Sequence, residues 1–291
     1  MTNMMKSFLT ILAAGLLTAS CIISINGGTW VGNCTEEGID FTDIRDVAPF
    51  NSLSSSLPCN VYYIQGDKQE VRVESTQEFA GKVLTEVESG TLKLKLEEGR
   101  YPKLILRVVV TSPDIESIAV RGSGNLIHEG TLHASHDLSL KVSGSGDIQA
   151  GDIDSQVFEA KVSGSGNLRI ASLACAGFTG HVSGSGSERI GSITSTGIDV
   201  SVGGSGSITI DTAKVDGDVN ARISGSGRIR LEDVTVDGDM DLSSTGSGNM
   251  TVNGSCHEVS ASTSGAGSIS GNLTHTGIHT HTSGSGHVNL Q

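Results

Sequence analysis

The stretch that decides the fold reads Lys161-Val162-Ser163-Gly164-Ser165-Gly166-Asn167-Leu168-Arg169-Ile170, and close copies of it lie on both sides. Its Gly-Ser-Gly tripeptide recurs along the chain, once as Gly-Ala-Gly, with first glycines at Gly122, Gly144, Gly164, Gly184, Gly204, Gly225, Gly246, Gly265 and Gly284. Successive copies are 22, 20, 20, 20, 21, 21, 19 and 19 residues apart. A period near twenty is typical of a solenoid, in which each repeat forms one coil.

Apolar and polar side chains alternate on both sides of each tripeptide. Apolar residues stand two and four positions before the first glycine, as Val162 and Ala160 do, and four and six positions after it, as Leu168 and Ile170 do. Strict alternation indicates half-buried strands. The sequence therefore predicts an all-β fold, a right-handed parallel β-helix with coils of about 20 residues and Gly-Ser-Gly corners.

The corners also account for much of the glycine, which makes up 39 of the 291 residues. A tight corner needs a positive φ or a close backbone approach, and glycine permits both. The serine between the glycines can bond to the backbone of the next coil. A phosphate-binding glycine loop opens a helix and does not recur between strands. Calcium-binding repeats are also disfavoured, because Asp follows the motif only at Asp147.

Charge and aromatic content exclude one class of partner. The formal net charge is −13, and the chain has one Trp, three Tyr and six Phe. A nucleic-acid-binding protein needs a basic face or stacking platforms. We therefore expect no nucleic acid partner.

The start of the chain is typical of an exported lipoprotein. Lys6 precedes an apolar run over 8–17 and small residues at 18–20, and Cys21 follows. This order predicts a signal peptide over 1–21 with a lipobox in which Cys21 becomes lipidated. Residues 22–45 are expected to form a tether, and 46–291 a single domain. Within it, capping strands span 46–118, including 61–64, 71–73, 92–96 and 103–110, and repeat coils span 119–291.

The remaining cysteines fit an oxidising compartment. Cys34 and Cys59 are the only plausible pair, and the sequence leaves open whether they pair. Cys175 and Cys256 occupy nearly the same phase of the repeat four coils apart, roughly 19 Å at the sheet spacing. A disulfide needs Cα atoms within about 7 Å. We predict that Cys175 and Cys256 are free within one chain.

Outward positions should form columns along the solenoid. Three residues before the corner they read Lys141, Lys161, His181, Ser201, Arg222, Ser243, Ser262 and His281. Five residues before it they read Ser139, Glu159, Thr179, Asp199, Asn220, Asp241, Ser260 and His279. Basic residues in one column lie beside acidic residues in the other, which predicts ion pairs between coils on a solvated face. Each exposed pair stabilises the fold by at most about 1 kcal/mol. A ligand groove along these columns is the alternative.

Candidate chemistry is sparse, and we predict no catalytic residues. Asp216-Gly217-Asp218 and Asp237-Gly238-Asp239 lie 21 residues apart and could stack in neighbouring loops, as turn residues or around a cation. His279 and His281 alternate onto one face of the last coil and are weak metal candidates beside polar surface residues. Glu188 stands at an otherwise apolar position and is expected to mark a local bulge.

Four further stretches carry a family resemblance. They are Arg45-Asp46-Val47-Ala48-Pro49-Phe50, Ile64-Gln65-Gly66-Asp67, Gly90-Thr91-Leu92-Lys93-Leu94 and Val110-Thr111-Ser112-Pro113. With the repeated Gly-Ser-Gly, the chain over about 43–275 resembles the GIN domain family of auto-transporter adhesin heads, common in Bacteroidetes. The resemblance implies a β-helix, secreted or on the envelope, with a role in adhesion. It supplies no catalytic residues to carry over.

The sequence thus favours a non-enzymatic envelope protein of a Gram-negative bacterium, anchored to the outer membrane through Cys21 on its periplasmic or surface face, with no cofactor. Its solenoid would serve adhesion or surface interaction with an extracellular or envelope ligand. The alternatives are a glycan-binding or glycan-degrading β-helix and a periplasmic scaffold or sensor accessory. An open β edge is a template for strand pairing, so we also expect end-to-end self-association through the C-terminal edge.

Overall fold

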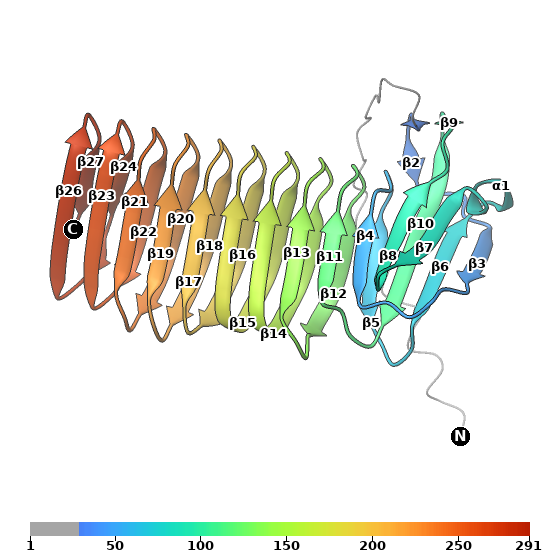
Figure 1. Cartoon of the computed structure of the whole chain (residues 1–291), viewed down its shortest axis with the longest axis horizontal. Helices are drawn as coiled ribbons and strands as arrows, with labels where there is room; N and C mark the ends of the chain where they lie inside the picture. Colours follow the sequence, from blue (N-terminus) through green and yellow to red (C-terminus); the bar gives the residue numbers. More distant parts are fainter. Residues whose placement is uncertain (1–28) are drawn as a thin grey trace.

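The computed structural model describes residues 29–291, and these form one continuous β-solenoid with an irregular N-terminal end (Figure 1). The predicted signal peptide and Cys21 lie outside the described residues. Within residues 29–291, no helix combines the length and apolarity needed to span a bilayer.

The N-terminal segment contains short strands and a single-turn helix. Its elements are β1 (Trp30–Val31), β2 (Cys34–Thr35), β3 (Phe41–Arg45), β4 (Ser52–Ser55), β5 (Val61–Gln65), β6 (Glu70–Ser75), α1 (Gln77–Ala80), β7 (Val83–Glu88), β8 (Thr91–Leu96), β9 (Arg100–Tyr101) and β10 (Leu104–Ser112). The strands predicted at 61–64, 71–73, 92–96 and 103–110 correspond to β5, β6, β8 and β10. Antiparallel pairs β6–β10 and β7–β8 distinguish this segment from the regular coils.

The tether prediction is wrong for part of 22–45. β3 pairs antiparallel with β6 over five residues, β2 pairs with β10 and β1 with β9. A disulfide joins Cys34 to Cys59, with a Cα–Cα distance of 5.6 Å. The chain from Trp30 onward therefore belongs to the folded end of the solenoid, because its strands complete edges that β6 and β10 would otherwise leave open.

The repeat region consists of strands that run parallel from coil to coil. They are β11 (Ser117–Val120), β12 (Leu126–His133), β13 (Leu138–Val142), β14 (Ile148–Val162), β15 (Asn167–Val182), β16 (Ser187–Ser195), β17 (Ile198–Val202), β18 (Ser207–Val215), β19 (Val219–Ile223), β20 (Arg228–Val236), β21 (Met240–Ser244), β22 (Asn249–Ser255), β23 (Glu258–Gly265), β24 (Ser268–Gly271), β25 (Leu273–Thr274), β26 (Gly277–Gly284) and β27 (His287–Leu290). The parallel solenoid with coils of about 20 residues is confirmed.

Two parallel sheets meet at the corners. The pre-corner sheet contains the strands that lead into the corners: β4, β11, β13, the ends of β14 and β15, β17, β19, β21, β23 and β26. The post-corner sheet contains the strands that leave them: β12, the starts of β14 and β15, β16, β18, β20, β22, β24 and β27.

Close backbone approach explains the corner glycines. A Cβ at Gly164 would lie well inside van der Waals distance of the carbonyl oxygen of Gly144, one coil earlier. The serine bonds to the preceding coil through its backbone, since the N–H of Ser165 donates to that same oxygen at 3.1 Å. Among the nine corners, all of them described, a positive φ occurs at Gly265 and Gly284. Most corners therefore need glycine for space and not for its backbone conformation.

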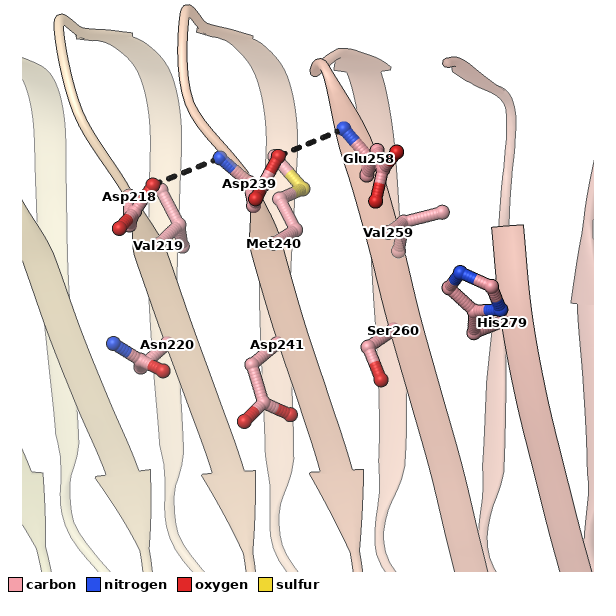
Figure 2. A pocket seen from close by; sticks show the side chains of 10 residues that line it. All are labelled: Asp218, Val219, Asn220, Asp239, Met240, Asp241, Glu258, Val259, Ser260 and His279. Atoms are coloured by element: carbon pink, nitrogen blue, oxygen red, sulfur yellow. Dashed lines mark hydrogen bonds between the residues drawn. The ribbon is translucent and has the colours of Figure 1, made fainter. Parts of the chain in front are cut away.

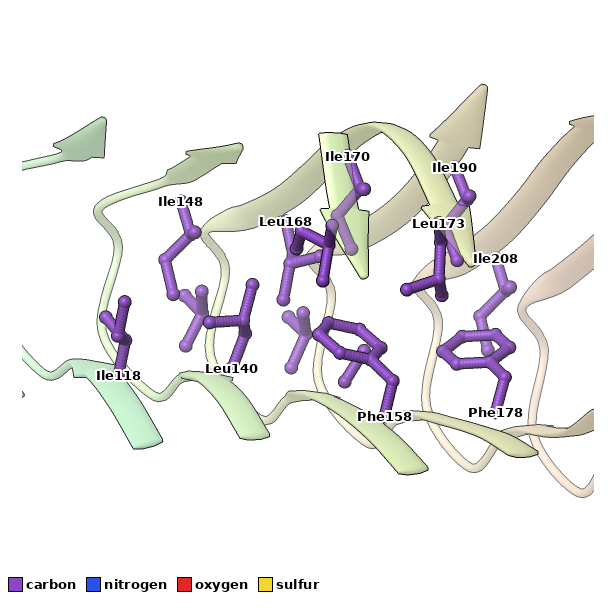
Figure 3. Close-up of a cluster of buried hydrophobic side chains, with 14 of the residues drawn as sticks. Ile118, Leu140, Ile148, Phe158, Leu168, Ile170, Leu173, Phe178, Ile190 and Ile208 are labelled. Atoms are coloured by element: carbon purple, nitrogen blue, oxygen red, sulfur yellow. The ribbon is translucent and has the colours of Figure 1, made fainter. Parts of the chain in front are cut away.

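The core is a narrow column of apolar side chains between the two sheets (Figure 3). Leu140 and Phe158 enter it from the pre-corner sheet, and Ile148 and Leu168 from the post-corner sheet, each at most 1% exposed. The rings of Phe158 and Phe178 stack with centroids 6.0 Å apart. The predicted alternation is confirmed, because polar residues between these positions face outward. Cys175 and Cys256 are free, as predicted.

Candidate functional site

The two predicted outward columns run along the pre-corner sheet. Ser139, Glu159, Thr179, Asp199, Asn220, Asp241, Ser260 and His279 are aligned strand by strand. The column two residues further on, from Lys141 to His281, is aligned in the same way. Outward side chains on parallel strands in register stack at the strand spacing of about 4.8 Å. The pre-corner sheet is therefore a flat, ladder-like surface.

Ion pairs between coils hold this surface, as the columns predicted. Lys141 Nζ lies 2.9 Å from Glu159 Oε2. The Lys141 ammonium, assisted by the Ser139 hydroxyl, holds the pKa of the Glu159 carboxyl below its usual range. Arg222 lies between two carboxylates, 3.5 Å from Asp199 and 3.7 Å from Asp241. All these groups are partly solvated, so each pair contributes at most about 1 kcal/mol.

An open hollow of about 210 Å³ lies toward the C-terminal end of the pre-corner sheet (Figure 2). It is lined by Asp218, Val219, Asn220, Asp239, Met240, Asp241, Glu258, Val259, Ser260 and His279. Figure 2 shows these side chains in two rows that cross successive coils and do not face one another across a cleft. The sequence predicted the rows but not the hollow, whose depth depends on the sizes of neighbouring side chains.

The acidic turns beside the hollow cap the backbone of the following coil. The predicted stacking of the two Asp-Gly-Asp loops is confirmed, since the Gly238 N–H donates to the Gly217 carbonyl at 3.1 Å. Asp218 Oδ1 accepts the Asp239 N–H at 2.9 Å, and Asp239 Oδ1 accepts the Glu258 N–H at 3.1 Å. These carboxylates therefore satisfy backbone donors at the turns.

His257 lies beside this row, with its Nδ1 2.9 Å from Asp239 Oδ1. That hydrogen bond lowers the pKa of the Asp239 carboxyl. Asp239 therefore stays ionised while it caps the next coil.

The two histidines proposed as weak metal candidates lie on β26. His279 borders the hollow, and His281 is aligned with Ser262 of β23. Residues 29–291 contain no group of three or more His, Cys, Asp or Glu side chains placed to hold a metal ion. The described part of the chain therefore places no third metal ligand beside these two imidazoles.

Glu188 is a buried carboxyl group, and the expected bulge is wrong. Leu168, Glu188 and Ile208 follow one another in unbroken register, and Glu188 is 1% exposed. Neither carboxyl oxygen has a side-chain hydrogen-bond partner among the described residues. Burial raises the pKa of Glu188 to about 8. The group is therefore mainly neutral at pH 7 and belongs to the core.

The sequence contains a signal that could have located this carboxyl. Gly180 interrupts the inward column between Ala160 and Val200. A Cβ at Gly180 would meet Glu188 Oε2 at 2.8 Å. The absence of a side chain at Gly180 on β15 thus leaves room for the larger, polar side chain of Glu188 on β16.

The post-corner sheet carries a row of arginines that the sequence reading did not single out. Arg169 pairs with Asp147 and Arg189 with Asp211, each at 2.8 Å. Further along the same sheet, Arg228 and Arg230 form no ion pair with any described residue, and both are exposed. Their guanidinium groups are therefore not neutralised by any carboxylate of the described residues.

Solved structures from Bacteroidetes share this fold. A "putative adhesin" from Parabacteroides distasonis aligns with a TM-score of 0.71 at 18% identity, over 89% of this chain and 100% of that chain. A "putative adhesin" from Bacteroides fragilis aligns with a TM-score of 0.60 at 16% identity, over the same shares. A "putative lipid binding protein" from P. distasonis aligns with 0.61 at 20% identity, again over 89% and 100%.

No curated protein matches the chain in sequence. The family model described as "Putative auto-transporter adhesin, head GIN domain" matches residues 49–232, which is more than half of the chain. This interval runs from the N-terminal capping strands into the regular coils. The chain therefore belongs to the GIN domain family of auto-transporter adhesin heads.

Proposed function

We propose that this chain is an exported envelope protein whose β-solenoid is a non-enzymatic adhesion surface. The flat ladder of the pre-corner sheet is the observation that carries the proposal. Its carboxylates either cap backbone amides, as Asp218 and Asp239 do, or pair with Arg222, as Asp199 and Asp241 do. Glycan hydrolysis needs two carboxyl groups that flank one bond, one of them a proton donor. The ladder spreads its acids along successive coils instead.

Family membership and the disulfide support the same proposal. The family is described by its adhesin head domain. The Cys34–Cys59 disulfide fits an oxidising compartment outside the cytoplasm. In this proposal a lipid on Cys21 holds the chain to the outer membrane of a Gram-negative cell. The exposed Arg228 and Arg230 are candidate contacts for an acidic ligand, because neither side chain pairs with a carboxylate anywhere in residues 29–291.

Protease treatment of intact cells tests the surface location. We expect the described domain to be cleaved on whole cells while a periplasmic marker protein stays intact. Full protection of the domain on intact cells, with cleavage after lysis, would exclude a surface adhesin and favour the periplasmic scaffold. A Cys21→Ser variant separately tests the anchor, and we expect it to leave the membrane fraction and to lose incorporation of labelled fatty acid.

A further inference from the structure

Two neighbouring arginines differ from the rest in having no side-chain partner. Residues 29–291 contain ten arginines. Eight of them pair with a carboxylate, donate to a hydroxyl oxygen or lie over an aromatic ring. Among the described residues only Arg228 and Arg230 are left without such a contact, and both are exposed. They stand two positions apart on β20.

The strand β20 directs both guanidinium groups outward. Ile229 and Leu231 alternate with the two arginines and are at most 1% exposed, in the core. Side chains two positions apart on a strand emerge on the same side, about 7 Å from each other. Each guanidinium can donate two parallel hydrogen bonds to one acidic group. The pair can therefore bind two neighbouring anionic groups, or both sides of one.

The surface around the pair contains no carboxylate, although the chain has 32 acidic and 19 basic residues. We call it the arginine face and define it as the first and third residues of β16, β18, β20, β22 and β24, which are aligned strand by strand. Figure 1 shows that these strands follow one another along the rod. Each of these residues is Ser, Thr, Asn or Arg. Arg228 lies between Ser207 and Asn249, and Arg230 lies between Thr209 and Thr251.

Carboxylates border the arginine face on one side and have partners of their own. Asp211 pairs with Arg189 at 2.8 Å. Glu232 accepts a hydrogen bond from Asn253 Nδ2 at 3.4 Å. The exposed Asp233 follows Glu232 and leads into the turn. An anionic ligand displaced toward this border would meet negative charge, so the border favours a ligand that stays on the face.

We propose that the arginine face binds a linear acidic polysaccharide. Its carboxylate or sulfate groups pair with Arg228 and Arg230, and its hydroxyl groups bond to neighbouring side chains such as Ser207, Thr209 and Thr251. This inference rests on the proposed adhesion role and names the class of ligand.

The composition of the face favours a polysaccharide over other acidic ligands. No first or third residue of the five strands is apolar or aromatic, so the face has neither contacts for the apolar side chains of a peptide nor platforms for stacked bases. An anionic membrane is a broad plane and would also approach Asp211, Glu232 and Asp233. A single narrow chain of sugars can lie along the hydroxyl groups and avoid these carboxylates.

Titration calorimetry of the purified full chain with three polysaccharides tests this proposal. Heparin carries sulfates and carboxylates, polygalacturonate carries carboxylates alone, and dextran is uncharged. We expect at least one of the two acidic polysaccharides to bind, more weakly at higher salt because ions screen the arginines, and dextran not to bind. The comparison of heparin with polygalacturonate shows which acidic group the face prefers.

The test variant is Arg228→Gln/Arg230→Gln. The matched control is Lys161→Gln/Lys214→Gln, which removes the same two charges from exposed lysines outside the arginine face that form no ion pair with a described residue. Both variants keep every ion pair of the described fold, so both should unfold at the wild-type temperature. We expect the dissociation constant to rise about tenfold or more in the test variant and to change less than about twofold in the control.

Three results would overturn the proposal. They are no binding of either acidic polysaccharide, an equal loss of binding in the two variants, which would mean that net charge alone decides, and equally tight binding of poly-glutamate, which would mean that the sugar contributes nothing. None of them depends on the location of the chain in the cell. Absent binding would therefore leave the protease result on intact cells standing, and a protected domain would leave the binding result standing.

Discussion

The carboxyl group of Glu188 occupies the space that a side chain at residue 180 would fill, since a Cβ on Gly180 would lie 2.8 Å from Glu188 Oε2. Gly180 and Glu188 lie in the two different sheets that flank the core. The same hypothetical Cβ would lie 2.9 Å from Phe178 Cζ. Gly180 thus leaves the space that the Glu188 side chain fills. A substitution at either residue should therefore change the effect of a substitution at the other.

Gly180→Ala should destabilise the fold by about 1–3 kcal/mol, because the added methyl group overpacks the core. In a Glu188→Val background the cost should be smaller, since the shorter side chain frees part of the space. Urea unfolding of the two single variants and the double variant gives the coupling free energy between the sites. Strictly additive effects would show that Glu188 does not occupy the space beside Gly180.

Glu188 should make the solenoid less stable as pH rises. Its pKa in the folded chain is about 8, against 4.5 for the model carboxyl group. The folded state therefore holds a proton that the unfolded state has lost, so the free energy of unfolding falls between about pH 4.5 and pH 8 and levels off above. The total loss is on the order of a few kcal/mol.

Glu188→Leu isolates this contribution, because Leu168 and Ile208 fill the equivalent positions in the neighbouring coils. We expect the variant to be more stable than the wild type at pH 8 and to lose the decline between pH 4.5 and 8. Unfolding measured at several pH values for both chains is the test. Parallel pH profiles for the two proteins would contradict a buried, protonated Glu188.

The corners should not tolerate a side chain. Gly164→Ala forces a Cβ against the backbone carbonyl of Gly144, and neither atom can move without separating two coils. We expect a loss of about 3 kcal/mol or more, or a failure to fold. Gly177→Ala is the matched control, because a Cβ there meets nothing within 4 Å. The control should be neutral or slightly stabilising, as thermal unfolding would show.

Local periodicity predicted most of the fold, and non-local packing determined the rest. The period near twenty residues and the alternation around Val162 and Leu168 placed the coils, both faces and the core. The strand β3 was missed because its pairing with β6 depends on residues some thirty positions away. Glu188 was misread because its place in the core depends on the space left at Gly180, in another strand.

The candidate surface was also only partly predictable from the sequence. Columns of outward residues follow from the repeat alone, so Lys141, Glu159 and Arg222 could be assigned to ladders before the fold was known. The hollow beside Asp239 could not, since it depends on how far side chains project in four consecutive coils. That Arg228 and Arg230 pair with no carboxylate of the described coils also required the fold, because a partner in a neighbouring coil is not visible in the sequence.

The Cys34–Cys59 disulfide should stabilise the N-terminal end of the solenoid. It closes a loop with a sequence separation of 25, and Cys59 is 2% exposed. Such a cross-link reduces the freedom of the unfolded chain by about 3 kcal/mol. The Cys34→Ala/Cys59→Ala variant should therefore lose about that amount, and a reducing agent should destabilise the wild type but not the variant. Cys175→Ala is the control, since Cys175 is free and half-buried. An equal effect of the reducing agent on the wild type and the Cys34→Ala/Cys59→Ala variant would show that the disulfide does not support this end of the fold.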